Sequence, residues 1–359
     1  FSKAVTDLGL CFVGPSHHLI ALMGDKINAI DTMRKYGVPT IPGSQGNLPN
    51  DPKQQKAIAA GIGYPVLIKA AAGGGGRGML PVYHEQDLSQ SVLGIKTQAK
   101  QLFANDDVYL EKYLEAPRHI EVQILADQFG EVVCVGDRDC SIQRRHQKII
   151  EEAPAFGIPE KAREQLFATC RRALKKIGYI GVGTIEMLYE RGQFYFIEMN
   201  TRIQVEHPVS EMVTGVDLIQ QQIRMHAGQK LDLSADQLSS RGHAIECRIN
   251  AENPATMQAS PGQITRLHFP GGHGVRVDSH IYAGFKVTHY FDSLIAKIIV
   301  HAESRSAAIR VMQHALNETY LEGVETNIPL HKNILASDSF QTEKIHIHFL
   351  TKAKHSADV

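Results

Sequence analysis

The sequence has no tryptophan, no net charge and no apolar run long enough to cross a bilayer. A membrane-spanning helix needs roughly 20 consecutive apolar residues. The 38 basic and 38 acidic side chains cancel, so no overall field draws the protein to nucleic acid or to an anionic membrane. We therefore expect neither among its partners, and any positively charged site must be local.

Cysteine is also scarce, with 5 residues that form no close pair in the sequence. An odd number of scattered cysteines is typical of reduced thiols in a cytosol-like compartment. We expect a cytoplasmic protein, or one of the mitochondrial matrix if the source is eukaryotic. The chain begins with Phe-Ser-Lys-Ala, without an initiator methionine or a signal peptide, and we expect it to be truncated at its start.

What is present is a globular composition, with 43% hydrophobic and 21% charged residues in a chain of 359. This length is sufficient for two or three domains. Apolar spacing and turn residues predict a series of helices and strands along the chain. In chain order they are a strand at 10–13, helices at 17–36 and 51–60, strands at 64–70 and 80–83, a helix at 88–103, strands at 107–114, 119–126 and 131–135, a helix at 161–177, a hairpin at 183–208, a helix at 216–227, strands at 243–252 and 295–300, and helices at 305–321 and 329–335.

Five glycines occupy six positions from Gly73 to Gly78, between two predicted strands. Such a run is costly in chain entropy, and a loop whose backbone N–H groups approach a polyphosphate would justify it, with Lys69 and Arg77 supplying charge. No Gly-Lys-Ser/Thr follows, so it is not a Walker loop, and the return to a strand excludes a dinucleotide fingerprint. A flexible surface linker is the alternative.

From Glu198 to Glu206, acidic, amide and guanidinium side chains alternate with apolar ones. Alternation with period two predicts a half-buried strand. An ordinary solvent-facing side would carry Lys, Glu and Thr, so this polar face indicates a reaction surface.

The strand at 183–189 precedes this one closely, which predicts a hairpin. If Gly192 takes the left-handed position of a three-residue loop, Glu186 and Glu198 become diagonal neighbours on one face; a two-residue loop would place them on opposite faces. With Asn200 they would offer the oxygen ligands that Mg²⁺ accepts. The alternative is a solvated acidic hairpin.

A charged run at 137–152 includes Arg144, His146 and Lys148. We expect it to interrupt the sheet. Such a run is usually a solvated face, but Arg, His and Lys together also favour an anion site.

Several segments together closely resemble biotin carboxylase, the ATP-grasp subunit or domain of biotin-dependent carboxylases. They are Met23-Gly24-Asp25-Lys26, the glycine run, Arg138 to Lys148, Glu198 to His207 and Glu246 to Glu252. The resemblance extends along essentially the whole chain, in order and with matching spacing.

The resemblance implies an α+β protein with the ATP-grasp fold, a small glycine-flap lid and a larger antiparallel-sheet C-terminal domain. The implied divisions are a remnant of an N-terminal domain with a linker helix at 1–40, the lid at 41–113, the catalytic body at 114–235 and the C-terminal domain at 236–359. A first domain of roughly a hundred residues would be largely missing, and we expect exposed apolar surface where it should dock.

The implied reaction carboxylates biotin at N1, using ATP and bicarbonate through carboxyphosphate, with Mg²⁺ or Mn²⁺. By similarity, the ATP phosphates would contact Lys26, Lys69, Gly75, Gly76 and His146, the adenine Glu111, Lys112 and Leu114, and the ribose His119 and Gln143. The metal would bind Glu186, Glu198 and Asn200. Bicarbonate and biotin would bind Lys148, Arg202, Gln204, Val205 and Arg248. The implied catalytic residues are Lys148, Arg202, Glu206 as the general base and Arg248 as the cation that stabilises the biotin enolate.

The resemblance also implies partners: a biotin carboxyl carrier protein or domain, carboxyltransferase subunits and a second copy in a homodimer. Acetyl-CoA carboxylase of fatty acid biosynthesis is one setting for such a protein, but a different domain chooses the final acceptor. Two alternatives remain, another ATP-grasp ligase and a truncated nucleotide-binding module without turnover.

Overall fold

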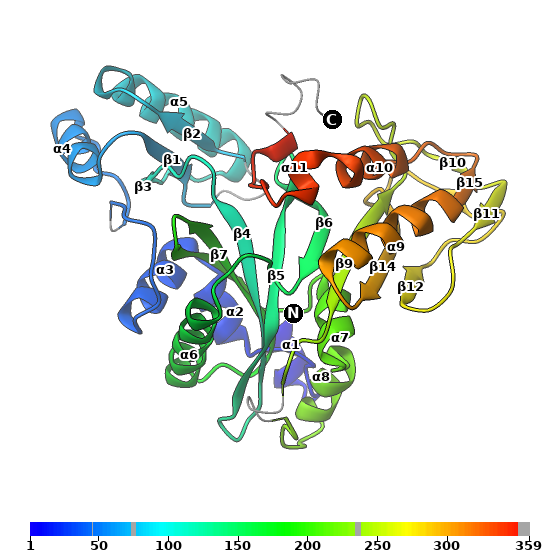
Figure 1. Ribbon diagram of the computed structural model, residues 1–359. Helices are drawn as coiled ribbons and strands as arrows, with labels where there is room; N and C mark the ends of the chain where they lie inside the picture. The colour runs from blue at the N-terminus through cyan, green and yellow to red at the C-terminus, as the bar shows by residue number, and fades with distance from the viewer. Residues whose placement is uncertain (45, 73–76, 234–237, 351–359) are drawn as a thin grey trace.

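An eight-stranded antiparallel sheet forms the centre of the computed structural model, which describes residues 1–44, 46–72, 77–233 and 238–350 (Figure 1). The strand order is β12-β14-β9-β6-β5-β4-β7-β8. The strands are β4 (Arg118–Ala126), β5 (Val132–Arg144), β6 (Gln147–Ala153), β7 (Gly181–Glu190), β8 (Gln193–Asn200), β9 (His243–Asn250), β12 (Val275–Ser279) and β14 (Leu294–Ala302). The sheet therefore includes strands from both sides of position 235.

Helices cover both faces of this sheet, because successive residues of a strand point to opposite faces and buried apolar side chains project from both. In β4, Ile124 packs with α2 (His17–Gly24), α3 (Lys26–Lys35) and α6 (Glu160–Ile177), whereas Leu125 packs with α8 (Leu218–His226) on the other face. α7 (His207–Thr214) joins α8 on that second face, and α9 (Arg305–Glu318) and α10 (Ile328–Ala336) cover β9 and β14 from the opposite side. No helix in the described part of the chain is long and apolar enough to span a membrane.

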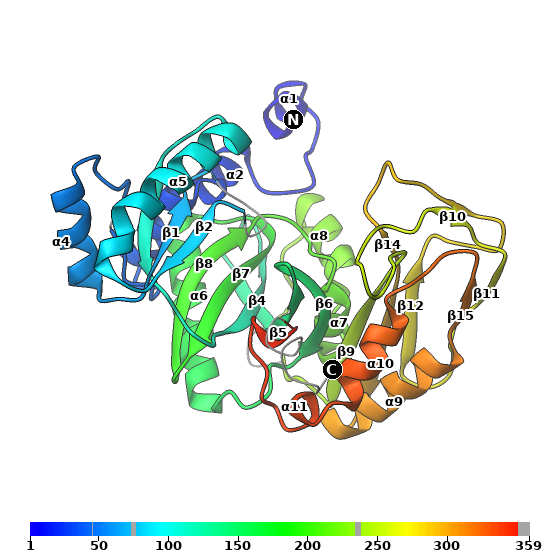
Figure 2. The same ribbon diagram turned by 90° about the horizontal axis from the view of Figure 1, so that it is seen from above.

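A smaller module stands at one end of the sheet (Figures 1 and 2). Its three strands, in the order β2-β1-β3, are β1 (Val66–Ala70), β2 (Met79–Val82) and β3 (Val108–Lys112). α4 (Pro52–Ile62) and α5 (Glu85–Phe103) pack on them around a core that includes Ile68, Leu88 and Leu110. We call this module the lid.

The short elements are α1 (Ser2–Asp7), α11 (Asp338–Gln341) and two two-stranded sheets, β10 (Gly262–Gln263) with β13 (Lys286–Val287) and β11 (Arg266–His268) with β15 (Tyr320–Glu322). α1 stands apart from the body in Figure 2. The predicted strand at 10–13 is wrong, since the segment pairs with no other strand in the described part of the chain, and Leu10 and Val13 are 61% and 47% exposed.

The predicted helix at 17–36 is two helices. Asp25 is extended, and its side chain accepts a hydrogen bond from the Asn28 N–H, so it caps α3. An Asp side chain competes with the backbone for such N–H groups. Lys26 consequently begins the second helix, where the chain direction changes.

The charged run at 137–152 does not interrupt the sheet. It continues β5 to Arg144, turns at Arg145 and His146 (φ 50° and 65°) and returns as β6. Buried charges are tolerated in strands when partners neutralise them, and the neighbouring strands supply those partners.

The alternation from Glu198 to Glu206 does not form one strand either. β8 ends at Asn200, an irregular segment follows to Glu206, and α7 begins at His207. Gln204 and Glu206 are buried while Arg202 is exposed. The alternating polar residues of this segment therefore make buried polar contacts and do not form the solvent-facing side of a strand.

The hairpin is confirmed, but its predicted loop is wrong. Glu190 pairs with Gln193, so the loop is the two residues Arg191 and Gly192, both with positive φ (51° and 81°). A bulge at Ile197 then shifts the register. Because a bulge inserts one residue, Glu186 and Glu198 still share a face, now directly opposite each other.

This turn predicts the effect of substitutions at its two positions. Arg191→Asn should raise the unfolding free energy by about 0.5–1 kcal/mol, because Asn adopts positive φ more readily than Arg. Thermal unfolding would measure it. As a matched control, Gly192→Ala should lower stability by about 1 kcal/mol through conformation alone, since an added Cβ would meet open space. A three-residue loop, in which position 191 has negative φ, would give no gain for R191N.

Candidate active site

A cleft of about 1320 Å³ lies between the lid, the central sheet and the C-terminal region. The described residues that the resemblance assigns to the site all line it: Lys26, Lys69, Glu111, Lys112, Leu114, His119, Gln143, His146, Lys148, Glu186, Glu198, Asn200, Arg202, Gln204, Val205, Glu206 and Arg248. Gly75 and Gly76 lie outside the described residues. Sequence reasoning did not select Ile347 and His348, which line the cleft from near the C-terminus.

The lid places a lysine and a glutamate at the cleft. Lys69 Nζ lies 2.7 Å from Glu111 Oε2, the two residues coming from the neighbouring strands β1 and β3. Burial alone would lower the pKa of Lys69, but Glu111, together with Tyr109 and Glu198, outweighs burial and raises it. Lys112 donates to the backbone carbonyls of Gly63 and Tyr64 at 2.8 and 2.9 Å, which fixes its stem. Arg77 is exposed and does not line the cleft.

The hairpin β7–β8 brings three oxygen donors together at the cleft. Glu186 and Glu198 are cross-strand partners, and Asn200 Nδ2 donates to Glu186 Oε1 at 2.8 Å. That contact uses the amide nitrogen of Asn200 and leaves its carbonyl oxygen for a cation. Two carboxylates and an amide oxygen are hard ligands of the type Mg²⁺ takes, so the residues fit a magnesium site.

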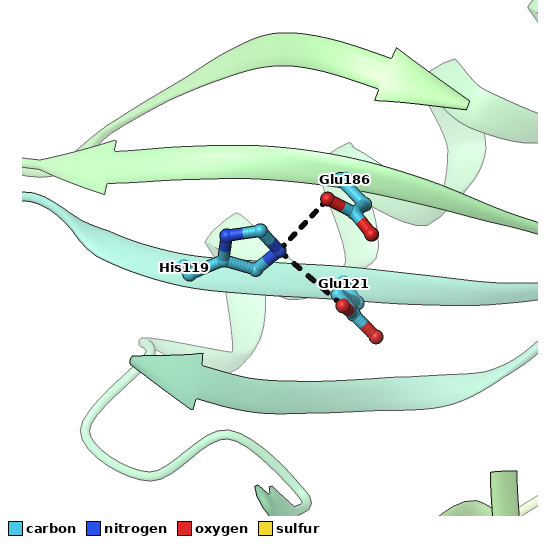
Figure 3. A group of neighbouring side chains, drawn as sticks. All are labelled: His119, Glu121 and Glu186. Carbon is cyan, nitrogen blue, oxygen red and sulfur yellow. Dashed lines mark ion pairs between the residues drawn. The ribbon is translucent and has the colours of Figure 1, made fainter. Parts of the chain in front are cut away.

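Glu186 also belongs to a buried cluster with His119 and Glu121 (Figure 3). His119 Nε2 lies 3.1 Å from Glu186 and 3.3 Å from Glu121. Burial would lower the pKa of His119, but the two carboxylates raise it to about 9, so the ring is a cation at neutral pH. This ring was predicted to touch the ribose; that role stays a prediction.

Lys148 joins three carboxylates from different parts of the chain. Its Nζ donates to Glu186 at 2.9 Å, to Glu206 at 2.8 Å, and to Glu121. The side chain is 13% exposed and faces the cleft. These contacts hold the predicted base, Glu206, beside the predicted metal ligand, Glu186.

Arg138 supports this arrangement, although sequence reasoning gave it no role. Its side chain is fully buried and donates to Glu121, Gln123, Thr184, Gln204 and Ser210 at 2.6–3.1 Å. The signal in the sequence was the set of polar residues at alternate positions of the predicted strand 119–126, which includes Glu121 and Gln123.

The segment between β8 and α7 is held through its carbonyl groups. His207 Nδ1 lies 2.8 Å from the Gln204 carbonyl oxygen, and Lys297 Nζ donates to that of Val205 at 2.7 Å. Arg202 is exposed, so its charge is directed to the cleft rather than to a buried acid. The segment thus presents a cation and, four residues later, a carboxylate.

Arg248 on β9 completes the set of charged residues at the cleft. Its Nε donates to Glu151 Oε1 at 2.6 Å and its Nη2 to Glu206 Oε2 at 2.8 Å. Burial and the nearby Glu121 would raise the pKa of Glu206, but Lys148 and Arg248 outweigh them and lower it. Glu206 is therefore ionised at neutral pH and able to accept a proton.

Comparisons with known proteins agree with this geometry. Residues 25–234 match the family model described as the carbamoyl-phosphate synthase L chain, ATP binding domain, and residues 246–352 match the biotin carboxylase C-terminal domain. The chain is 53% identical to biotin carboxylase of Haemophilus influenzae over 98% of its own length and 79% of that protein. The chain belongs to the biotin carboxylase family.

More distant members of the family are similar over the same length. Biotin carboxylase 1 of Bacillus subtilis is 46% identical, covering 98% of this chain and 78% of that protein. The biotin carboxylase domain dimer of Hydrogenobacter thermophilus 2-oxoglutarate carboxylase, solved with MgADP, ADP and bicarbonate, superposes with a TM-score of 0.93 at 45% identity, covering 99% of this chain and 78% of that one. These matches confirm the ATP-grasp fold.

A pH measurement tests the hydrogen bond between His331 and the backbone of Arg248. His331 Nε2 donates to the Arg248 carbonyl oxygen at 2.7 Å, and burial lowers the pKa of His331 to about 4. An unfolded histidine takes up its proton near pH 6.5, so the stability that neutral His331 contributes is present above pH 6.5 and is lost as pH falls through 4.

We expect the unfolding free energy of the wild type, relative to His331→Asn, to fall by up to about 3 kcal/mol between pH 7 and pH 4. Urea unfolding at both values measures this difference and cancels the carboxylates common to the two proteins. A difference that does not change with pH would show that His331 takes up its proton at the same pH in the folded and the unfolded chain, which would contradict the lowered pKa.

Proposed function

We propose that this chain carboxylates biotin with bicarbonate and ATP, giving N1-carboxybiotin, ADP and phosphate. The observation that supports this most is that one cleft contains the acidic hairpin, the exposed Arg202, and Arg248 paired to Glu206. A ligase of this class needs a site for polyphosphate and metal beside a site for a one-carbon acid, and these groups meet both needs.

The lid and the hairpin would bind the nucleotide. Lys26 and Lys69 supply positive charge at the cleft for the phosphates, and Mg²⁺ held by Glu186, Glu198 and Asn200 would neutralise charge on the phosphate oxygens. Burial lowers the pKa of Lys26, against a partial opposite effect of Glu198. Glu111, Lys112 and Leu114 are proposed to surround the adenine, and His119, Gln143 and His146 to contact the ribose and phosphates.

The segment after β8 would bind bicarbonate and activate it. Arg202 grips an anion with two donors, together with Lys148, Gln204 and Val205, and Glu206 accepts the bicarbonate proton. The bicarbonate oxygen then attacks the terminal phosphorus of ATP, and ADP leaves. The resulting carboxyphosphate releases CO₂ and phosphate.

Biotin would receive the carboxyl group next to Arg248. The released phosphate takes the N1 proton of biotin, N1 attacks CO₂, and Arg248 stabilises the enolate oxygen of the ureido ring. A positioned cation at developing negative charge contributes several kcal/mol to lowering the barrier.

We infer a lid at 41–113, a body at 114–235 and a C-terminal domain at 236–359, and the wider setting of a biotin carboxyl carrier protein, carboxyltransferase subunits and a dimer in a reducing, cytoplasmic compartment. The last point is supported by the cysteines, since Cys11, Cys134, Cys140, Cys170 and Cys247 form no disulfide.

The decisive assay follows ATP cleavage with bicarbonate, Mg²⁺ and biotin, each omitted in turn. We expect Arg248→Ala to bind ATP within about twofold of the wild type and to lose carboxylation by at least about 100-fold. Arg276→Ala is the matched control, because Arg276 also pairs with two carboxylates, Glu211 and Asp278, but lies outside the cleft. Equal losses of ATP binding and carboxylation in R248A would contradict the assignment.

The same assay separates the alternatives. Another ATP-grasp ligase would cleave ATP without a response to biotin. A binding module would bind ATP and release no phosphate.

A metal titration tests the hairpin. Glu198→Gln should require about tenfold more Mg²⁺ for half-maximal ATP cleavage, because one charged ligand is lost. Glu190→Gln is the control, since Glu190 ends the same strand as Glu186 but accepts a hydrogen bond from Ala116 outside the cleft. An unchanged titration in E198Q would remove Glu198 from the metal site.

A further inference from the structure

Arg248 is fixed at its backbone as well as at its side chain. Its carbonyl oxygen accepts hydrogen bonds from Asn327 Nδ2 at 2.9 Å and His331 Nε2 at 2.7 Å. Two of its guanidinium nitrogens bind Glu151 and Glu206. The third, Nη1, makes no hydrogen bond to the residues that the structure describes, and Arg248 lines the cleft.

Among the described residues, the Glu151 side chain hydrogen-bonds to the cleft through Arg248. It lies on β6, is fully buried and does not line the cleft. Its Oε1 accepts from Arg248 Nε, whereas its Oε2 has no hydrogen-bond partner among the described residues. A buried carboxylate with one strong contact to a cation has its orientation set by that contact.

Glu246 faces Glu151 directly across the β6–β9 pair but does not compete for Arg248. It is fully buried, and neither of its oxygens has a hydrogen bond within the described ranges. The nearest ion-pair distance is 4.0 Å, to Lys297 Nζ. Burial and repulsion by Glu151 raise the pKa of Glu246 well above its usual range, and burial raises the pKa of Glu151 to about 7 against the opposing effect of Arg248. Arg248 pairs with Glu151, because its Nε donates to Glu151 Oε1 and it makes no such bond to Glu246 among the described residues, and the Glu151 carboxylate is charged above pH 7.

We propose that Glu151 is a positioning residue that holds Arg248 between Glu206 and the biotin ring. The hydrogen bond to Glu151 holds Arg248 Nε beside β6. Nη2 therefore donates to Glu206, and Nη1 is left for the substrate. Arginine and a carboxylate prefer a bidentate pair. Without the charge of Glu151, Arg248 would rotate into such a pair with Glu206. The guanidinium would then move away from the biotin ring, and Glu206 would become a weaker base.

This inference rests on the proposed function and predicts a specific kinetic pattern. Glu151→Gln keeps the size and the acceptor oxygen but removes the charge. We expect it to lower kcat for biotin carboxylation about 10- to 100-fold, the cost of a misplaced group. KM for ATP should stay within about twofold, since neither the lid nor the hairpin contacts Glu151. Glu151→Asp keeps the charge and should recover part of the lost kcat.

The neighbouring Glu152 provides a matched control. It is also buried, 1% exposed, and it pairs with Arg305 at 2.7 Å and His243 at 2.9 Å. Strand alternation directs it to the opposite face from Glu151, away from the cleft. Glu152→Gln therefore removes an equally buried ion pair from the same strand, and should lower thermal stability while leaving kcat within about threefold.

The outcomes distinguish the inference from the proposed function. A fall in kcat in E151Q but not in E152Q, at constant KM for ATP, supports positioning. Equal falls in both, or an E151Q kcat within twofold of the wild type, overturn it. If E151Q does not fold, E151D decides in the same way, through a reduced or an unchanged kcat. A wild type without biotin-dependent ATP cleavage overturns the proposed function and this inference with it.

Discussion

A buried set of opposite charges across the middle of the sheet is the constraint on which the cleft depends. Four carboxyl groups pair with four cations: Glu121, Glu151, Glu186 and Glu206 with Arg138, Lys148, Arg248 and protonated His119. Removing one partner of a buried pair costs about 3–5 kcal/mol, because the other charge is left without compensation. The network thus fixes where each side chain lies before any substrate binds, which is the preorganisation that electrostatic catalysis requires.

The charges on β7 and on β9 are connected because the chain crosses the sheet between β8 and α7. Glu186 on β7 and Arg248 on β9 are separated by the three strands β4, β5 and β6, and adjacent strands lie about 4.8 Å apart. Residues 201–206 span that gap, and α7 then packs against β5, β6, β9 and β14. A strand in register with β7 could not make this crossing, which explains why the segment is irregular and why its polar side chains are buried.

The sequence was sufficient for most elements, and for the side chains that gather at the cleft, because acids, amides and cations at alternate positions have few structural explanations. It could not reveal how the hairpin achieves its pairing. The predicted three-residue loop and the observed two-residue turn with a bulge at Ile197 give the same face to Glu186 and Glu198. Local propensity favours positive φ at Gly192 in both cases, so only the cross-strand register distinguishes them. Arg138 was missed for a similar reason, since a buried arginine is recognised by partners that are distant in sequence.

The charges of the lid are compensated separately from those of the sheet. Lys69 pairs with Glu111 inside the three-stranded lid sheet, and Lys112 binds carbonyl oxygens of the same module. The lid also has its own apolar core. A displacement of the lid relative to the body would therefore break no ion pair of the central network and would leave no buried charge of that network without a partner. By contrast, Glu186 and Glu206 both pair with Lys148. The metal ligand and the base therefore cannot move apart without leaving a buried charge unpaired. The lid can therefore move without disturbing the central network, whereas the metal ligand Glu186 and the base Glu206 are held together by Lys148.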